Sequence, residues 1–338
     1  YVSGSITPIL TFDGSSDVHV DFNYIGQPLA TPADPANGIG YRGAAVVYFK
    51  NGCNGAAVFG GFRHARYGVL SGDYADWTKG GNRDIFCKLN AYRVGYPVAH
   101  YLAEDVRSDL HVEDTHRAAY YAGVKYGSIR ASVKNQYIAP IQVLLTDAIT
   151  GAGTSRGCSH VDVVVADRGT TYSTSTYSYL CGISLSRVDP GTVYENLRFT
   201  LNLSATDSAA NMVGGFILNS TVSAILPAQY PNNWINEISI RDVTVSGVID
   251  RSAQTSMLGT VYDLYIAAEQ DATHIPQVTR LDLDRFRVLA GGSGAPKPLY
   301  VHVPGLTDRM NVFNCEFTTM TKDFQAPAGK PINYVLTP

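Results

Sequence analysis

The feature of this sequence that most limits its fold is a short phrase that recurs along the chain. Each copy has a polar turn pair, then apolar residues at alternate positions, then a polar residue or a glycine. Alternation with a period of two puts every second side chain on the same side of an extended strand. The phrase therefore predicts strands with one buried face and one wet face, as in Ile129, Ala131 and Val133. The nine copies occupy residues 15–26, 82–95, 107–123, 127–135, 158–169, 195–204, 236–247, 279–288 and 308–317.

The spacing of the copies indicates how these strands are connected. The copies lie about 20 to 50 residues apart, and tight two-residue hairpin signals between them are scarce. Such spacing fits one turn of a solenoid with loops of variable length. A β-sandwich also uses short alternating strands, but its strands would not share an opening phrase. We expect an all-β fold, a single-stranded right-handed parallel β-helix over residues 1–318, with a C-terminal extension over residues 319–338.

Composition agrees with an all-β fold. Hydrophobic residues make up 45% of the chain and charged residues only 16%, against a charged share of about 25% in a typical soluble domain. The best helical candidate, residues 262–270, is short and rich in β-formers. Three segments rich in Pro, Gly and Asn, at residues 26–40, 219–234 and 291–298, interrupt the repeat. We expect these segments to be loops that build a binding surface.

Charge and cysteine content exclude several classes of function. A net charge of −3 lacks the basic stripe of nucleic-acid-binding proteins, and no stretch approaches the roughly 20 apolar residues that cross a membrane. Five cysteines without a CxxC pair indicate neither a zinc site nor a disulfide framework, so we expect buried structural thiols and no cofactor. The chain begins with Tyr1 rather than methionine, and we expect it to be a processed part of a longer fibre protein.

The repeated phrase, on a chain rich in Gly and Tyr, resembles the pectate-lyase-like β-helix superfamily. Within it the chain resembles the receptor-binding tailspikes of bacteriophages, over residues 5–320 as architecture. This resemblance implies a homotrimer in the virion tail that binds and depolymerises bacterial capsule or lipopolysaccharide O-antigen. The calcium-binding aspartate cluster of pectate lyases and the paired aspartates of polygalacturonases are missing from the sequence. No catalytic residue is therefore carried over from those families.

A second pattern, an arginine followed closely by a tyrosine, marks candidate binding residues. Arg63, Arg93 and Arg117 lie 30 and 24 residues apart, about one turn of a solenoid, and we expect them to stack in a ladder. Arginine binds carboxylates through a planar fork of donors, so the ladder predicts binding of an acidic glycan. The structural alternative is that each arginine pairs with nearby acids or covers aromatic surface. The other residues expected to contact the glycan are Tyr96, Tyr120, His116 and Trp77.

The densest group of titratable residues, at residues 103–117, supplies candidate catalytic carboxylates. Glycoside hydrolysis usually needs two carboxylates about 5 to 10 Å apart, and neighbouring strands lie about 4.8 Å apart. Because Leu110 and Val112 are expected to point inward, Glu113 is expected to point outward. Glu113 is the first candidate, and its candidate partners are Asp114, Glu104 and Asp105. The structural alternative is that all four are solvated turn residues.

An elimination mechanism would use different residues from the same segment. Arg117 would neutralise a uronic carboxylate, and His116, Tyr120 or Lys125 would act as the base. The sequence thus predicts an endo-acting polysaccharide depolymerase, with hydrolysis favoured over elimination. The alternatives are a non-catalytic glycan-binding fibre, a cell-surface adhesin, and a secreted bacterial polysaccharide lyase or epimerase.

Overall fold

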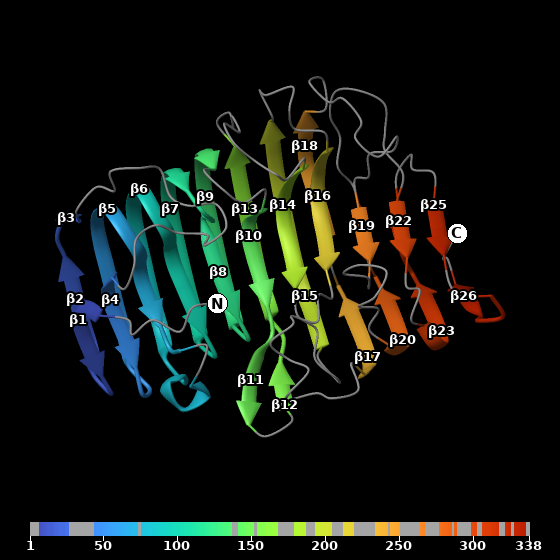
Figure 1. Ribbon diagram of the computed structural model, residues 1–338, viewed down its shortest axis with the longest axis horizontal. Helices are drawn as coiled ribbons and strands as arrows, with labels where there is room; N and C mark the ends of the chain where they lie inside the picture. The colour runs from blue at the N-terminus through green and yellow to red at the C-terminus, as the bar shows by residue number, and fades with distance from the viewer. Residues whose placement is uncertain are drawn as a thin grey trace.

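The protein is all-β in the computed structural model, and nearly all of its strands are parallel (Figure 1). The described residues form one 24-stranded parallel sheet and one two-stranded antiparallel sheet. The one helical turn described within them is the 3-10 turn η2 (Trp77–Lys79). This arrangement is compatible with a parallel β-helix. The structure describes residues 7–26, 44–73, 76–136, 141–151, 154–167, 179–186, 193–204, 212–219, 234–242, 244–250, 264–267, 277–285, 287–288, 299–302, 306–317, 322–325 and 328–335.

The strands fall into series in which each strand is hydrogen-bonded to a strand that comes later in the chain. The first series comprises β2 (Ser16–Asp21), the start of β5 (Asn54–Ser71), the start of β6 (Arg83–Tyr101), β7 (Glu104–Thr115), β9 (Lys125–Gln136), β13 (Ser159–Asp167), β15 (Val193–Ser204), β18 (Thr244–Asp250), β21 (Arg287–Val288) and β24 (Glu316–Phe317).

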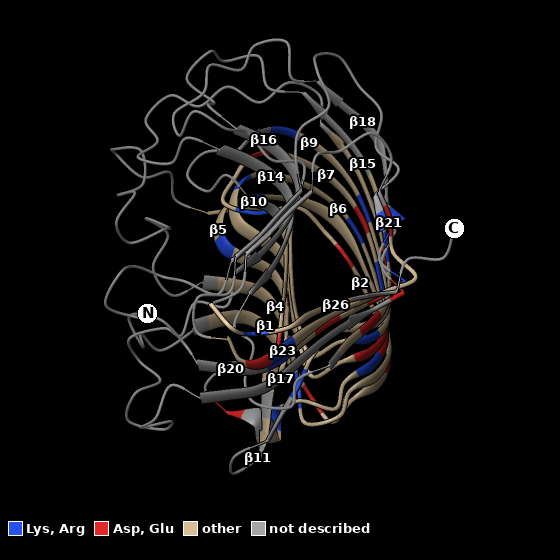
Figure 2. Cartoon of the chain, turned by 90° about the vertical axis from the view of Figure 1, so that its right-hand side faces the viewer, with Lys and Arg blue, Asp and Glu red and all other residues tan. Residues whose placement is uncertain are grey.

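The second series runs beside the first. It comprises β1 (Thr7–Asp13), β4 (Ala44–Lys50), the ends of β5 and β6, β8 (Ala119–Ala122), β10 (Ile141–Thr146), β14 (Tyr179–Ser186), β16 (Met212–Asn219), β19 (Leu264–Ala267), β22 (Leu299–His302) and β25 (Lys322–Gln325). Figure 2 looks along the stack and shows β2 and β21 on one side and β1 and β4 on the other.

A third series appears later in the chain, and a few strands lie outside all three. The third series comprises β17 (Trp234–Arg241), β20 (Gln277–Asp284), β23 (Leu306–Phe313) and β26 (Ile332–Val335), and it begins against the start of β15. The remaining strands are β3 (Tyr24–Ile25), which pairs with β5, and the antiparallel pair β11 (Ala148–Gly151) and β12 (Thr154–Arg156).

The polar turn pair of the recurring phrase forms one corner of the stack. At each entry into the first series one residue has a φ between +48° and +68°, and the register places these residues opposite one another. Short Asp and Asn side chains and glycine tolerate this left-handed conformation best, and they hold seven of the ten positions. This corner column consists of Asp17, Gly55, Asp84, Asp105, Tyr126, His160, Asn196, Asp242, Arg285 and Asn314.

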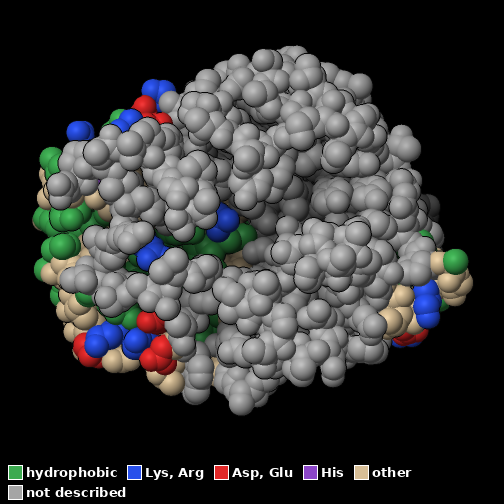
Figure 3. Space-filling model, in the orientation of Figure 1, with side chains coloured by type: hydrophobic (Ala, Val, Ile, Leu, Met, Phe, Trp, Pro, Cys, Tyr) green, Lys and Arg blue, Asp and Glu red, His purple; other side chains and the backbone are tan. Residues whose placement is uncertain are grey.

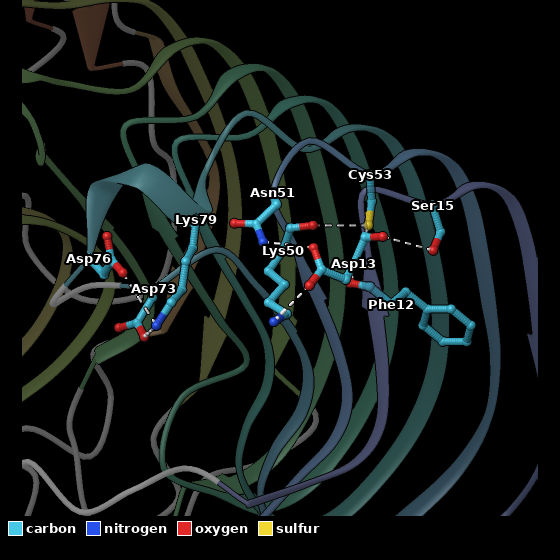
Figure 4. Close-up of polar contacts among 9 residues, drawn as sticks. All are labelled: Phe12, Asp13, Ser15, Lys50, Asn51, Cys53, Asp73, Asp76 and Lys79. Carbon is cyan, nitrogen blue, oxygen red and sulfur yellow. Dashed lines mark hydrogen bonds and ion pairs between the residues drawn. The ribbon is translucent and has the colours of Figure 1, made fainter.

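Polar contacts join the first repeats near this corner (Figure 4). The Asp13 carboxylate accepts hydrogen bonds from Lys50 Nζ at 2.9 Å and from Asn51 Nδ2 at 2.7 Å. The buried thiol of Cys53 donates to the carbonyl oxygens of Phe12 and Lys50, each at 3.3 Å. Exposed ion pairs contribute little stability individually, typically less than about 1 kcal/mol. The corner is therefore held mainly by its backbone and buried groups.

The apolar core lies between the series, and equivalent positions of successive strands stack in it. Val58, Ile129 and Phe199 are each at most 1% exposed. Burial of a side chain of this size stabilises the fold by roughly 1.5–3 kcal/mol. Leu110 and Val112 point inward and His111 is exposed, as the alternation in the sequence predicts. One inward column consists of Val58, Cys87, Ser108, Ile129, Val163 and Phe199.

The buried cysteines belong to this core. Burial raises the pKa of the Cys87 thiol, and it raises that of Cys158 to about 12, so both thiols are protonated at neutral pH. This agrees with the structural role expected from the sequence. The free buried thiols that the structure describes are Cys53, Cys87, Cys158 and Cys315.

Some sequence-based expectations differ from the structure. The copy at residues 107–123 was expected to open with a turn at its first residues, but the corner lies earlier, at Asp105. Ser108 points into the core instead, where its hydroxyl oxygen lies 2.8 Å from Tyr121 Oη. The helical candidate at residues 262–270 contains strand β19. The expected boundary after residue 318 stays a prediction, while β25 and β26 beyond it pair with β22 and β23. Most of the three expected loops lies outside the described residues.

The buried side chain of His100 leads us to predict that the stability of the fold depends on pH. His100 is fully buried, its ring lies edge-on to Tyr121 at 5.2 Å, and neither ring nitrogen has a hydrogen-bond partner among the described residues. Burial lowers the pKa of His100 to about 3, whereas an unfolded histidine has a pKa of about 6.5. The unfolded chain therefore binds the extra proton between these values. Stability should fall as the pH drops from about 6.5 towards 3.

Denaturant unfolding at several pH values tests this prediction. His100→Leu should reduce the loss of unfolding free energy below pH 6.5 by up to about 1.4 kcal/mol per pH unit. The matched control His111→Leu, which removes an exposed imidazole, should keep the wild-type slope. Equal slopes in His100→Leu and the wild type would contradict the prediction.

Candidate functional site

A second bend brings together most of the residues that the sequence singles out. Strands β5 and β6 pass without a break from the first series into the second, and they bend at His64 and Arg93, whose φ values are +56° and +52°. The next strand, β7, ends in a similar bend at Asp114, with a φ of +52°. The register aligns these three residues. The bend cluster is defined as Arg63, His64, Tyr92, Arg93, Glu113, Asp114 and Lys134.

The bend cluster contains two ion pairs between neighbouring strands. Arg63, Tyr92, Glu113 and Lys134 are aligned in register on four successive strands. Lys134 Nζ lies 3.0 Å from Glu113 Oε1, and Arg93 Nε lies 3.5 Å from Asp114 Oδ2. Both carboxylates therefore have a cationic partner.

Tyr92 is the aromatic centre of the bend cluster. The guanidinium carbons of Arg63 and Arg93 lie 6.0 and 5.3 Å from its ring centroid, within the range of cation–π contact. The His64 ring meets Tyr92 edge-on at 6.0 Å. Burial and the charges of Arg93 and Arg63 lower the pKa of His64. The cluster thus presents two guanidinium groups and a neutral imidazole around one ring.

Beyond the bend, tyrosines cover the outer face of the second series. Tyr67 and Tyr96 are opposite each other in register, and their rings stack with centroids 5.3 Å apart and an interplanar angle of 16°. Tyr120 meets Tyr96 edge-on at 5.7 Å, and it packs against Tyr101 with centroids 5.4 Å apart and an interplanar angle of 48°. Together with Tyr48 these rings form an apolar cluster separate from the core. We call Tyr48, Tyr67, Tyr96, Tyr101 and Tyr120 the tyrosine cluster.

Basic side chains border the tyrosine cluster. The guanidinium carbon of Arg66 lies 5.2 Å from the Tyr67 centroid, and that of Arg117 lies 6.0 Å from the Tyr96 centroid. The His116 ring meets Tyr96 edge-on at 5.2 Å. Figure 3 shows hydrophobic side chains with Lys or Arg side chains beside them near the middle of this view.

His116 and Arg117 each have a buried polar side-chain atom. Both backbone N–H groups donate to the carbonyl oxygen of Gly95, each at 3.2 Å. His116 Nδ1 and Arg117 Nε are buried and have no hydrogen-bond partner among the described residues. Burial, followed by the positive charge of Arg117, lowers the pKa of His116 well below its usual range. His116 is therefore a neutral imidazole beside a guanidinium group at neutral pH.

The structure groups eight of the eleven predicted site residues around this bend, but it does not stack the three arginines. Arg63 lies opposite Tyr92, one position away from Arg93, and Arg117 lies beyond the bend beside Gly95. Equivalent positions in β5 and β6 are one residue closer along the sequence than Arg63 and Arg93 are. Arg93 therefore falls one position past Arg63 in the register. The eight residues are Arg63, Arg93, Tyr96, Glu113, Asp114, His116, Arg117 and Tyr120.

Glu104 and Asp105 lie at the opposite end of β7. Glu104 is nine residues from Glu113 along the strand, roughly 30 Å at about 3.3 Å per residue, so the two carboxylates do not share a site. Glu104 forms ion pairs with Arg83 at 3.4 Å and Arg156 at 3.3 Å. Asp105 is an exposed member of the corner column. Trp77 begins η2, and its side chain lies outside what the structure describes.

Sequence reasoning did not assign Arg66, Tyr67, Tyr92 and Lys134 to the site. A signal for three of them was present, because Arg66–Tyr67 and Tyr92–Arg93 are adjacent arginine–tyrosine pairs. Lys134 had no such signal, since only the register of β7 and β9 places it against Glu113.

Comparison with protein-family models and with curated proteins found no match to this chain. Within the described ranges no group of three or more His, Cys, Asp and Glu residues is arranged to hold a metal ion. The same ranges contain no helix that is both long and apolar enough to cross a membrane. The function therefore has to be argued from the bend and tyrosine clusters themselves.

Because the tyrosine cluster is closely packed, we predict that removing one of its rings destabilises the fold. Tyr96 is 9% exposed and contacts Tyr67, His116 and Tyr120, so Tyr96→Ala should lower the free energy of unfolding by about 3 kcal/mol or more. Tyr92→Ala, at a half-buried position in the bend cluster, should cost less than half as much. Chemical denaturation of both variants measures the difference, and equal losses would show that the tyrosine cluster is not a packed unit.

Proposed function

We propose that the chain is a right-handed parallel β-helix of tailspike type that binds an acidic bacterial surface polysaccharide at the bend cluster and cleaves it. The observation that carries this proposal is the concentration of guanidinium groups, tyrosine rings and two adjacent carboxylates at one bend. In this proposal the protein belongs to a virion tail; a secreted or cell-surface bacterial protein is the alternative.

The charges of the bend support binding of an anionic glycan. Arg63 is exposed, and the side chains of Arg93 and Lys134 are each 45% exposed. Guanidinium groups bind carboxylates with two parallel hydrogen bonds. Because Arg63 and Arg93 already lie against Tyr92, less side-chain freedom is lost when a ligand binds.

Hydrolysis would use Glu113 and Asp114, the two adjacent carboxylates. Their ion pairs with Lys134 and Arg93 suit a charged nucleophile or base. The acid of a glycosidase must instead hold a proton, so one carboxylate would have to lose its cation when the polysaccharide binds.

Elimination is the second candidate, and a specific observation favours it. His116 is neutral and lies next to Arg117. Abstraction of a proton beside a carboxylate needs a neutral base and a cation that stabilises the developing negative charge. His116 would accept the proton, and the Arg117 guanidinium group would stabilise the negative charge that develops on the carboxylate.

Incubation with a panel of capsular and O-antigen polysaccharides separates these chemistries. New reducing ends alone indicate hydrolysis, and reducing ends together with the ultraviolet absorbance of an unsaturated sugar indicate elimination. Binding without either product indicates a non-catalytic fibre or adhesin. Under hydrolysis, Glu113→Gln should lower the rate by about 100-fold or more, as expected for loss of a catalytic acid or base, while binding persists.

Asp109→Asn is the matched control, because Asp109 is an exposed carboxylate on the same strand away from the bend, and it should keep full activity. Arg93→Ala and Arg117→Ala should weaken binding, and more so for acidic than for neutral glycans. Full activity in both Glu113→Gln and Asp114→Asn would remove hydrolysis from the bend. Unchanged binding in both arginine variants would contradict the proposed site.

The tailspike proposal also makes a prediction about assembly. The tailspike resemblance implies a homotrimer, and the low share of charged residues, 16% of the chain, is the feature of the sequence that accompanies this expectation. Light scattering at micromolar concentration should give a mass about three times that of the 36.5 kDa chain. A monomer would contradict the trimer.

A further inference from the structure

Three residues of the corner column, Tyr126, His160 and Arg285, are neither Asp, Asn nor Gly, and Tyr126 is the one with an exposed phenol ring. Tyr126 has a φ of +55°, a region that bulky residues rarely enter because the Cβ atom crowds the following carbonyl oxygen. Its side chain is 54% exposed, so burial does not offset this strain. Asp, Asn or Gly would adopt the same backbone more easily. Burial in the core therefore does not explain a tyrosine at this position.

The Tyr126 ring is supported from one side. The His160 ring, which follows it in the corner column, packs against it with centroids 4.9 Å apart and an interplanar angle of 41°. His160 Nε2 lies 3.0 Å from Asn196 Nδ2, which fixes the imidazole in turn. An exposed aromatic ring is thus held in one orientation by two neighbouring repeats.

The residue in register with Tyr126 on the preceding strand is an aspartate. The register places Asp105 opposite Tyr126 on the preceding strand. Asp105 is exposed and forms no ion pair with the residues that the structure describes. Its side chain is short and no described aromatic ring packs on Tyr126 from this side. Tyr126 therefore combines an exposed ring with an exposed aspartate in register on the preceding strand.

We infer that Asp105, Tyr126 and His160 form a binding site for a pyranose ring of the glycan. The apolar C–H face of the sugar packs on Tyr126. The hydroxyl groups at the edge of the sugar donate hydrogen bonds to the two oxygens of the Asp105 carboxylate. This inference rests on the proposed function because its ligand is a sugar. The site lies eight residues from Glu113 along β7, roughly 26 Å at about 3.3 Å per residue, so it can be tested separately from the bend cluster.

Nuclear magnetic resonance with small glycosides tests the site directly. The probes are the methyl pyranosides of glucose, galactose, mannose and rhamnose, and the signals are the ring resonances of Tyr126 and His160. At least one glycoside should give a saturable shift of the His160 resonances, with a dissociation constant on the order of millimolar. In Tyr126→Asn this shift should be lost, while the midpoint of thermal unfolding should stay the same or rise because the strain is removed. Asp105→Asn, which keeps one acceptor oxygen, should weaken binding without abolishing it.

Two binding results would overturn the inference: no shift of the His160 resonances with any of the four glycosides, or an undiminished shift in Tyr126→Asn. Clear destabilisation of Tyr126→Asn would also overturn it, because the ring would then be a structural element. Arg93→Ala is the control, because it alters the bend cluster and should keep the His160 shift. If polysaccharide binding depends on Arg93 but no glycoside shifts His160, the inference fails and the proposed function stands. If His160 shifts but polysaccharide binding is independent of Arg93, the inference stands and the bend-cluster function fails.

Discussion

The parallel hydrogen-bond register is the constraint on which the rest of the structure depends. It places each residue opposite the equivalent residue of the next repeat, so that a residue type suited to one repeat suits its neighbours. Inward positions therefore form apolar columns such as Val58, Cys87 and Ile129, and the left-handed corner recurs from Asp17 to Asn314. An insertion between strands changes the length of a repeat but not the register within it, which explains how loops of different lengths fit one stack.

The same constraint determines the chemistry of the outer surface. Side chains on successive strands are close enough to interact, so Tyr67 stacks on Tyr96 and Lys134 pairs with Glu113. Figure 2 shows Lys, Arg, Asp and Glu residues gathered along the first series, whereas the tyrosine cluster covers part of the second. The bend between the two series brings charged and aromatic groups together. The polysaccharide that we propose as the ligand has hydroxyl-rich edges and apolar ring faces, which would contact these two kinds of group.

Much of the fold was predictable because its signals are local. The period of two assigned Leu110 and Val112 to the core and His111 to solvent, and polar residues such as Asp84 and Asn196 marked the corner. The site was predictable only as a region. Arg63 and Arg93 were expected to stack, but the register puts Tyr92 opposite Arg63. Glu104 was expected to work with Glu113, but the strand separates them because β7 runs straight across the first series.

The sequence by itself determined which side chains of each strand face inward, because the alternation of a strand depends only on neighbouring residues. It also indicated most of the places where the chain turns into the first series, because Asp, Asn and Gly accept a left-handed backbone best and hold seven of the ten corner positions. Only the tertiary structure decided which residue lies over which, since a shift of one position changes every cross-strand pair and the register arises from hydrogen bonds between residues far apart in the chain. For this reason Lys134 against Glu113, His116 beside Tyr96, and Asp105 opposite Tyr126 became visible only in the folded protein.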